Sequence, residues 1–547
     1  MKCTLNRILS VILLICAVVP ASFSQQESHL RDQIWGSLRV LITDAETGHN
    51  LDARCYLEDS SKHPWSPSHV ITYVKPPEFD FIAQGGFQIN LPPGDYVLTV
   101  GRGPEYHSIK RQVEIRPGEI LQLKVELRRW INMNALGWYS GDLHNHRDWW
   151  EMPQILLSED LNLAPTLTTW IWEYRPIVTT PPLRGPAVRY VDATHVYSVF
   201  DTEIERLGAG PGAVCMIGLE SPVKFSGSLL SPPSPAFCAL AHGQGGFVDA
   251  EKITWRDSAA LLALGQVDSV GLVYNSFSPH GVEMGWGVNP DPNSAYATPA
   301  GAPLWAMDLY YKFLNCGFRL AASAGTASGV KPTPLGYDRV YVHLPGKFSY
   351  QDWFRALKAG RSFATNGPML FLTVNGRKPG DTIQIPAGGG STVKPLRVHA
   401  EVSSANEVDR LEIVWKGKVV NTVSAPPQSH DLKTDFEMMP DDTGWLVARA
   451  FEKPTQSICF AHTSPVYIKM GRRSGIVSRD ARFFTAWMDG EIRFYESFQG
   501  FRSQPDRQRM VEMFNKARTV YEHLADMAKD TVPESRRGES GPVSLGP

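Results

Sequence analysis

The chain has 547 residues, of which 43% are hydrophobic and 20% are charged. This is the composition of a folded protein with room for three or four domains, and it excludes a disordered chain. The 54 basic and 56 acidic side chains leave a formal net charge of −2, so no general attraction to nucleic acid or to anionic lipid is expected.

Residues 1–24 have the pattern of a secretory signal peptide. Lys2 and Arg7 precede an apolar run over residues 8–19, and a short Ser-Phe-Ser stretch follows it. The run is too short to span a bilayer well, and no later stretch approaches a membrane span. We therefore expect an exported protein, periplasmic or extracellular, with no transmembrane segment in the mature chain.

The cysteines of the mature chain do not form a recognisable pattern. Five remain after residue 24, an odd number without a close Cys-x-x-Cys spacing. Neither a disulfide framework nor a thiolate zinc site is indicated, and an exported chain of this size can rely on its hydrophobic core instead.

Residues 33–128 are predicted to be β throughout. Short apolar runs at 37–43, 87–91 and 96–100 alternate with turn chemistry at 44–48 and at Pro92-Pro93-Gly94, which is typical of an antiparallel sandwich. The Thr47-Gly48 pair and the later Leu-Pro-Pro-Gly-Asp-Tyr run resemble the transthyretin-like carboxypeptidase regulatory domain. The resemblance implies an accessory module without catalytic residues.

In residues 129–365 short apolar strands alternate with segments that can be helical. The expected strands include 214–219 and 267–274, and the expected helices 236–242 and 258–264. Such alternation favours a parallel α/β barrel or sheet, in which functional groups gather at the carboxyl ends of the strands.

The run Gly141-Asp-Leu-His-Asn-His-Arg147 contains the first candidate site. Histidines at i and i+2 at a strand end point to the same side, roughly 6.5 to 7 Å apart, so both can reach one metal ion or two ions that share a site. The alternative is a pair of surface histidines. Because Asp142 can orient a ligand from behind, the context favours metal binding by His144 and His146.

Several motifs together resemble the CehA/McbA family of metallohydrolases in the PHP superfamily. They are the His-x-His run, Glu159–Pro165, Ala241–Val248, Leu314–Leu320, Ser323–Thr326 and Leu357–Pro368, which follow one another over some 230 residues. The resemblance implies a distorted (β/α)₇ barrel that holds one to three divalent metal ions, namely zinc, manganese or iron.

Carried over by position, the resemblance implies that His144, His146 and Glu220 bind metal. Two positions depart from the family pattern. Lys252 stands where a histidine is usual, in the run Asp249-Ala-Glu251-Lys252, and Ala327 stands where an aspartate is usual. An aspartate ligand is therefore missing.

The replacement at Lys252 leaves three alternatives open. A carbamylated lysine would offer a carboxylate that bridges two metals, an ammonium would replace one metal, and a buried ion pair with Glu251 would fill a vacated metal site. Glu251 and Lys252 are accordingly candidate metal ligands, and Lys252 is also a candidate catalytic group.

Arg147 and His280 are the remaining catalytic candidates. Arg147 lies beside the histidine pair and is expected to contact an anion or carbonyl, or else to be a salt-bridge partner. His280 follows a predicted strand at the same rim, where an ordinary loop histidine is the alternative, and Asp249 has similar standing. His242 precedes a glycine turn and is expected to be scaffold, whereas His195 lies in an insertion.

Large aromatic residues follow several predicted strand ends. Aromatics in such places usually belong to the core, but their number favours a small-molecule substrate that is apolar or carries an aromatic ring. The residues are Trp149, Trp150, Trp170, Trp172, Tyr174 and Trp286.

The chain is expected to turn β again after the barrel. Alternating strands predict a second sandwich at 368–470, helix-period apolar positions predict an amphipathic helical tail at 478–528, and the Gly-, Ser- and Pro-rich remainder at 529–547 is expected to be disordered. The tail would lie on the body or on a partner subunit.

Three functions fit this organisation. The first is an exported hydrolase that cleaves an ester, amide, carbamate or phosphoester bond with metal-activated water. The second is a PHP-like binding protein that has lost catalysis, and the third is a structural or carbohydrate-binding envelope protein. Metal content separates the first from the second.

Overall fold

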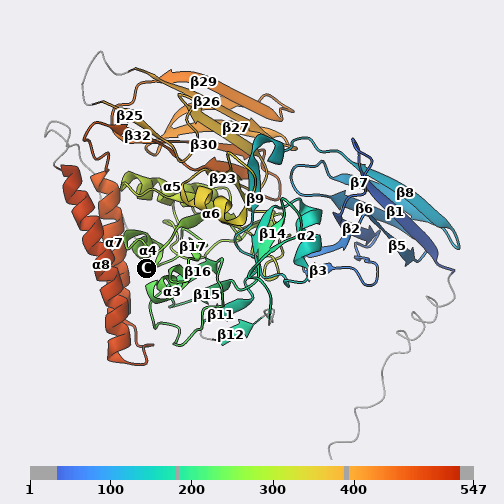
Figure 1. Ribbon diagram of the computed structural model, residues 1–547, viewed down its shortest axis with the longest axis horizontal. Helices are drawn as coiled ribbons and strands as arrows, with labels where there is room; N and C mark the ends of the chain where they lie inside the picture. The colour runs from blue at the N-terminus through green and yellow to red at the C-terminus, as the bar shows by residue number, and fades with distance from the viewer. Residues whose placement is uncertain (1–33, 174, 179–183, 387–393, 530–547) are drawn as a thin grey trace, which may run out of the picture.

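A computed structural model describes residues 34–173, 175–178, 184–386 and 394–529. They form an N-terminal β unit, a central α/β body, a second β unit and a helical hairpin (Figure 1). The expected signal peptide lies outside the described residues, as does the expected disordered tail apart from Lys529. Among the described helices, none combines the length and the apolar character that crossing a membrane requires.

The N-terminal unit consists of two sheets around one core. The sheets have the orders β5-β1-β8 and β3-β4-β2-β6-β7. Along β6 every second side chain, Tyr96, Leu98 and Val100, is buried, as strand alternation requires. Strand β8 runs parallel to β1, so the unit is not antiparallel throughout. The bounds are β1 Gly36–Asp44, β2 Ala53–Asp59, β3 Thr72–Lys75, β4 Glu78–Ala83, β5 Gly86–Leu91, β6 Gly94–Gly101, β7 Ile109–Ile115 and β8 Ile120–Leu127.

The central body contains a seven-stranded sheet with the order β12-β11-β15-β16-β17-β18-β21. Strands β19 and β20 form a separate pair, and the remaining strands belong to a larger sheet. The short η1 helix spans Asn134–Leu136 and the α-helices are α2 Met152–Glu159, α3 Pro235–His242, α4 Ser258–Ala263, α5 Ala302–Asn315 and α6 Tyr350–Lys358. The strands are β9 Trp138–Gly141, β10 Leu163–Pro165, β11 Thr169–Trp172, β12 Arg175–Val178, β13 Val188–Tyr190, β14 Val196–Ser198, β15 Thr202–Arg206, β16 Gly212–Ile217, β17 Phe247–Ala250, β18 Ser269–Tyr274, β19 Phe277–Ser278, β20 Gly281–Val282, β21 Ala321–Gly325, β22 Arg339–His343 and β23 Ser362–Thr365.

The mixed α/β, multidomain architecture agrees with the expected fold class, but the strands described here do not close into a barrel. Parallel pairing holds for β17, β18 and β21, whereas β16 runs antiparallel to both of its neighbours. Only residues 207–211 join β15 to β16, and so short a connection requires antiparallel pairing. The apolar pattern of the sequence identified β16 as a strand, but it did not determine whether β16 runs parallel or antiparallel to its neighbours.

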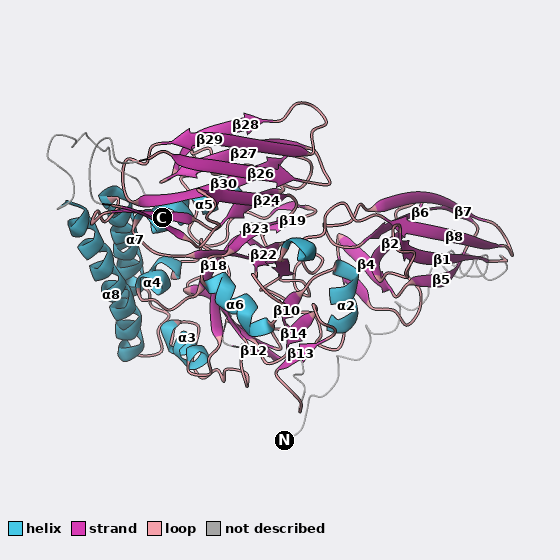
Figure 2. Ribbon diagram, turned by 45° about the horizontal axis from the view of Figure 1, so that its top comes forward, coloured by secondary structure: helices cyan, strands magenta, loops and turns pink. Residues whose placement is uncertain are grey.

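The second β unit is continuous with the body. One sheet runs from β13 through β9, β22 and β23 into β31, β30, β27 and β28, and the sheet β24-β26-β29 packs on it (Figure 2). Leu370, Val398 and Leu446 lie in the shared core. The bounds are β24 Met369–Val374, β25 Thr382–Ile385, β26 Leu396–Ser403, β27 Val408–Trp415, β28 Lys418–Ser424, β29 Asp431–Met438, β30 Gly444–Glu452, β31 Phe460–Thr463 and β32 Val466–Met470.

Helices α7 (Ser478–Ser497) and α8 (Gln504–Lys529) form a hairpin along one side of the body (Figure 1). Phe484 stacks on Phe313 of α5 with ring centroids 4.1 Å apart, and the Tyr521 hydroxyl donates to the Ala259 carbonyl at 2.7 Å. The tail was expected to lie on the body or on a partner subunit, and in the structure it packs on the body.

Candidate metal centre

His144 and His146 follow directly after β9 and are held by backbone hydrogen bonds. The His144 N–H donates to Asp142 Oδ1 at 3.1 Å, and the His146 N–H donates to the Ser328 carbonyl at 2.7 Å. The His144 carbonyl in turn accepts from the Ala327 N–H at 2.7 Å. Residues 327–329 therefore lie alongside the histidine pair and fix its backbone.

The two imidazoles converge on the carboxylate of Glu203 in β15. The two Nε2 atoms are 3.0 Å apart, and Glu203 oxygens lie 3.4 Å from His144 Nε2 and 3.0 Å from His146 Nε2. All three side chains are buried. One ligand atom from each lies within 4.8 Å of the others, a spacing that a single metal ion could fill.

Glu251 orients the first histidine. Its Oε2 lies 3.1 Å from His144 Nδ1, which leaves Nε2 of the same ring facing Glu203 and His146. A carboxylate behind a histidine is the usual arrangement around metal-bound imidazoles, because it fixes the tautomer and raises ligand basicity. Lys252 Nζ and the Trp255 indole N–H both lie 2.7 Å from Glu251 Oε1 and hold this carboxylate.

The acidic side chains come from one face of the seven-stranded sheet. Glu203 is in register with Cys215 on β16, and Cys215 is in register with Asp249 on β17. Glu205 and Glu251 lie two residues further along β15 and the β17 end, so they share that face. Oxygens of Glu203, Glu205 and Glu251 form a second group within 4.8 Å.

Burial and neighbouring charges oppose each other in this cluster. Burial lowers the pKa of His144, but the Glu203 and Glu251 carboxylates outweigh it and raise that pKa to about 10. Burial likewise favours neutral Glu203, yet the two histidines hold its pKa well below the ordinary value. Burial and the Glu203 charge raise the pKa of Glu205 to about 8. A proton on His144 thus offsets the negative charge of Glu203 and Glu251. A divalent cation at the same place could offset that charge instead.

The donor set fits a divalent metal ion. Both Glu203 oxygens are buried, and neither accepts a well-oriented hydrogen bond although histidine nitrogens lie nearby. Buried carboxylate oxygens are normally satisfied, and a divalent cation between Glu203 and the two imidazoles would satisfy both of these atoms. Two imidazoles and one carboxylate form the ligand set of several catalytic zinc sites, with a fourth position left for water.

Glu220 does not lie in this cluster. It is exposed, and the Gln244 side chain accepts from its backbone N–H at 3.1 Å. Because β16 is antiparallel to β15 and β17, its carboxyl end lies at the opposite edge of the sheet from Glu251. The carboxylate that lies beside the two histidines is that of Glu203, not that of Glu220.

Arg147 and His280 both contact the N-terminal unit. Arg147 Nε donates to Glu151 at 2.9 Å, and its guanidinium lies 4.6 Å from the centre of the Tyr73 ring. His280 Nε2 lies 2.8 Å from Glu78 on β4. Neither residue belongs to the groups that could hold a metal among the described residues.

Lys252 is buried and forms the ion pair with Glu251 that was one of the three alternatives. Its Nζ lies 2.7 and 2.9 Å from the two Glu251 oxygens and 4.7 Å from the Trp255 ring centre. Asp249 lies on the same face but accepts hydrogen bonds from two serine hydroxyls, one of them Ser323 at 2.6 Å.

His195 and His242, the two other histidines considered from the sequence, have partners outside the cluster. His195 Nδ1 lies 2.8 Å from Asp192, and His242 Nε2 lies 3.0 Å from Asp268. Asp192 lies three residues before His195, whereas Asp268 lies 26 residues after His242 and ties the end of α3 to the start of β18, which agrees with a scaffold role for His242.

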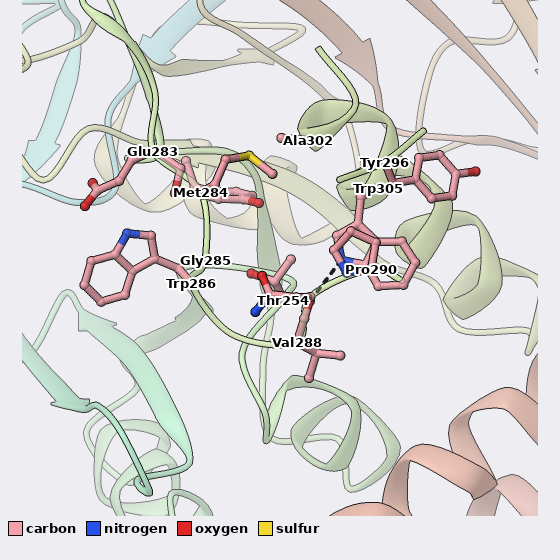
Figure 3. Close-up of a pocket in the computed structure, with 13 residues that line it drawn as sticks. Thr254, Glu283, Met284, Gly285, Trp286, Val288, Pro290, Tyr296, Ala302 and Trp305 are labelled. Carbon is pink, nitrogen blue, oxygen red and sulfur yellow. Dashed lines mark hydrogen bonds between the residues drawn. The ribbon is translucent and has the colours of Figure 1, made fainter. Parts of the chain in front are cut away.

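Two of the aromatic residues adjoin the cluster. Trp170 lies 4.9 Å from the His146 ring, and its indole N–H donates to Glu205 at 3.2 Å. Trp286 lies 5.9 Å from Lys252 Nζ and lines a small cavity together with Thr254 and Trp305 (Figure 3). Aromatic surface is therefore present near the centre, although no substrate follows from it.

Sequence reasoning missed Glu203 and Glu205. Their signal is the run Thr202-Glu-Ile-Glu-Arg206, in which two acids alternate on a strand that is buried. Glutamate is rarely buried without a partner, so two on one face of an interior strand indicate a site.

The comparisons with known proteins do not assign a family. No family model matches the chain, and no curated protein matches it. The solved structure of the Bacillus anthracis TIE protein is 8% identical, with 80% of this chain and 50% of that chain covered and a TM-score of 0.13. A β-glucuronidase of Parabacteroides merdae is 10% identical, with 81% and 61% covered and a TM-score of 0.15. The chain thus spans about half to three fifths of these proteins, and TM-scores so low bear on neither fold nor function.

Proposed function

We propose that the protein is an exported metal-dependent hydrolase of the PHP type, with a CehA/McbA-like centre, that cleaves an ester, amide, carbamate or phosphoester bond. The observation that carries this proposal is the convergence of His144, His146 and Glu203, whose buried nitrogen and oxygen ligand atoms lie within 4.8 Å of one another. The order of the sequence motifs supports the same family.

His144, His146 and Glu203 would hold the ion. Bound there, a divalent metal supplies a Lewis acid that polarises the scissile bond and lowers the pKa of a water. Glu251 keeps the His144 ring in its ligating tautomer, and Trp170 covers the His146 ring on one side. These contacts preorganise the ligands before the ion binds.

Glu205 would accept or return a proton during the reaction. Its carboxyl oxygens lie within 4.8 Å of those of Glu203 and Glu251, beside the proposed ion, where a carboxyl group can give up and take back a proton. Lys252 would supply a fixed positive charge beside Glu251, as an ammonium rather than as a carbamate, because its Nζ contacts both oxygens of that carboxylate.

A second candidate function is a binding protein of the same architecture without catalysis. The Glu251–Lys252 ion pair favours it, since an ammonium close to the second acidic group competes with a second metal ion. Metal analysis distinguishes the two candidates.

The test starts with metal content. We expect purified mature protein to contain zinc, manganese or iron in stoichiometric amount and to melt at a higher temperature when metal is added, because an ion that binds only the folded state stabilises it. The double variant His144→Ala/His146→Ala should lose the ion and the thermal shift.

His242→Ala is the matched control, because this histidine contacts Asp268 outside the cluster and its loss should leave metal occupancy unchanged. Wild-type protein without metal, and with a melting temperature that ignores added metal, would rule out the hydrolase. A panel of ester, amide, carbamate and phosphoester substrates, run on metal-loaded protein, then separates hydrolase from binding protein.

A further inference from the structure

The N-terminal β unit reaches the metal centre through strand β3. Tyr73 is the one buried side chain of β3 and is 5% exposed, whereas the other three side chains of the strand are exposed. Its hydroxyl accepts from the Gly329 N–H at 2.7 Å and donates to the Lys331 carbonyl. The Tyr73 hydroxyl therefore links two backbone groups of the loop and holds the loop against β3.

The same loop fixes the ligating histidines. Ser328, next to Gly329, accepts the His146 N–H at 2.7 Å and forms a parallel bridge with Asn145. A β-carbon on Gly329 would lie 2.6 Å from the His146 carbonyl carbon, so the two backbones are in direct contact. A single step therefore separates the Tyr73 hydroxyl from the backbone of a metal ligand.

Arg147 strengthens this connection from the other side. Its guanidinium lies 4.6 Å from the Tyr73 ring centre, and it donates to the Thr72 carbonyl at 3.3 Å. Strand β3 thus contacts Arg147, which follows His146 in the chain, and also the loop of residues 328–331, which lies beside His146. Cation–π contacts of this kind are stronger where the groups are shielded from water, as both side chains are here.

We infer that Tyr73 is a positioning residue of the metal centre, through which the N-terminal β unit holds the His144–His146 segment in its ligating geometry. This inference rests on the proposed metal site. It gives the N-terminal unit a part in the site, whereas the sequence indicated an accessory module. Groups that hydrogen-bond a ligating side chain commonly contribute 10- to 100-fold to metal affinity. Because Tyr73 acts one contact further away, through the loop beside His146, the lower figure is expected.

The experiment compares Tyr73→Phe with Tyr96→Phe. Both variants lose one buried-ring hydroxyl in the same β unit, but the Tyr96 hydroxyl donates to Pro92, within its own domain. Affinity for Zn²⁺ and Mn²⁺ is measured by competition with a chelator, and melting temperatures are recorded on metal-free protein. We expect Tyr73→Phe to weaken metal binding about 10-fold and Tyr96→Phe to leave it unchanged, at similar metal-free stability.

Hydrogen exchange on metal-free protein provides a second measurement. The amides of residues 144–147 and 327–331 should exchange faster in Tyr73→Phe than in Tyr96→Phe, because the loop loses its tie. Equal affinities and equal exchange would overturn the inference. Wild-type protein that binds no metal would overturn the proposed function, and the exchange experiment would still decide whether Tyr73 holds the histidine segment.

Discussion

Glu203 is the residue at which the proposed metal site is most sensitive to a single change. Glu203→Gln keeps the shape and removes the charge that faces both imidazoles. Since its oxygens lie 3.0 and 3.4 Å from the histidine nitrogens, we expect metal affinity to fall by about 100-fold, the upper end for changes around such sites. The measurement is chelator competition with Zn²⁺.

Glu220→Gln is the control for this experiment, because it makes the same chemical change at an exposed position in the loop after β16. Its metal affinity should equal that of the wild type. Strong loss in Glu220→Gln with none in Glu203→Gln would reverse the assignment and support the ligand that the sequence alone suggested.

Lys252→Met tests the role of the ammonium beside Glu251. Replacing Lys252 with methionine leaves the buried Glu251 carboxylate without its cation, which should cost about 3 kcal/mol of stability in metal-free protein. Without the ammonium, the group of Glu203, Glu205 and Glu251 can accept a further ion. We expect the metal content per chain to rise by one, measured by elemental analysis.

Lys331→Met is the matched control, since Lys331 pairs with the half-exposed Glu283 away from the acidic group. Its metal content should stay at the wild-type value. An unchanged metal content and an unchanged melting temperature in Lys252→Met would contradict the assigned role of the ammonium.

Sequence reasoning identified part of this centre. His144, His146 and Glu251 were predicted, and the structure brings all three together. The alternating acids of β15 could have marked Glu203 as part of a site, but its place beside the histidines depends on register: β15 places it opposite Cys215, on the face that Glu251 also lines. A pattern of single residues does not contain the pairing of strands.

At the scale of elements, the loop beside the histidines depends on Gly329. Its φ of +101° disfavours other residues, and an added β-carbon would lie 2.6 Å from His146 backbone atoms. We expect Gly329→Ala to cost stability beyond the roughly 1 to 2 kcal/mol of a left-handed residue, and to weaken metal binding because His146 must shift.

Gly48→Ala separates the two effects. Gly48 also has a positive φ, of +71°, but an added β-carbon would meet nothing within 4 Å. Its unfolding free energy, from urea titration, should fall by the backbone cost alone, and metal affinity should not change. Equal losses in the two variants would show that the contact with His146 is unimportant.

The elements themselves were predicted more reliably than their arrangement. Apolar runs located β16 and β18 of the body and β1, β5 and β6 of the N-terminal unit, because burial on a pleated surface leaves that trace in sequence. The direction of β16 and the sheet that continues from β9 into β31 depend on loop lengths and on partners far away in the chain. For that reason the carboxyl end of β16 could not be placed correctly from periodicity.

At the scale of the whole molecule, buried ion pairs join the N-terminal unit to the end of α2. Arg54 pairs with Glu159 at 2.5 Å, and Asp160 pairs with Arg102 at 3.1 Å and with Arg129 at 2.8 Å. Burial favours neutral Asp160, but the two arginines keep its pKa below the ordinary value. The arginines of the N-terminal unit and the acids at the end of α2 therefore keep each other ionised in the buried contact.

Asp160→Asn tests whether these pairs make the two units unfold together. Asparagine tolerates the positive φ of +48° at this position, so the change removes mainly the charge. Arg102 then loses its carboxylate partner and Arg129 keeps only Glu105, which should cost about 3 kcal/mol. In calorimetry we expect the N-terminal unit to melt separately, at a lower temperature than the body. Asp95→Asn makes the same substitution at an exposed position of that unit and should leave the transition as it is. If Asp160→Asn melts like Asp95→Asn, the units are held together by apolar contacts, and Tyr73 would stay close to the metal centre without help from these charges.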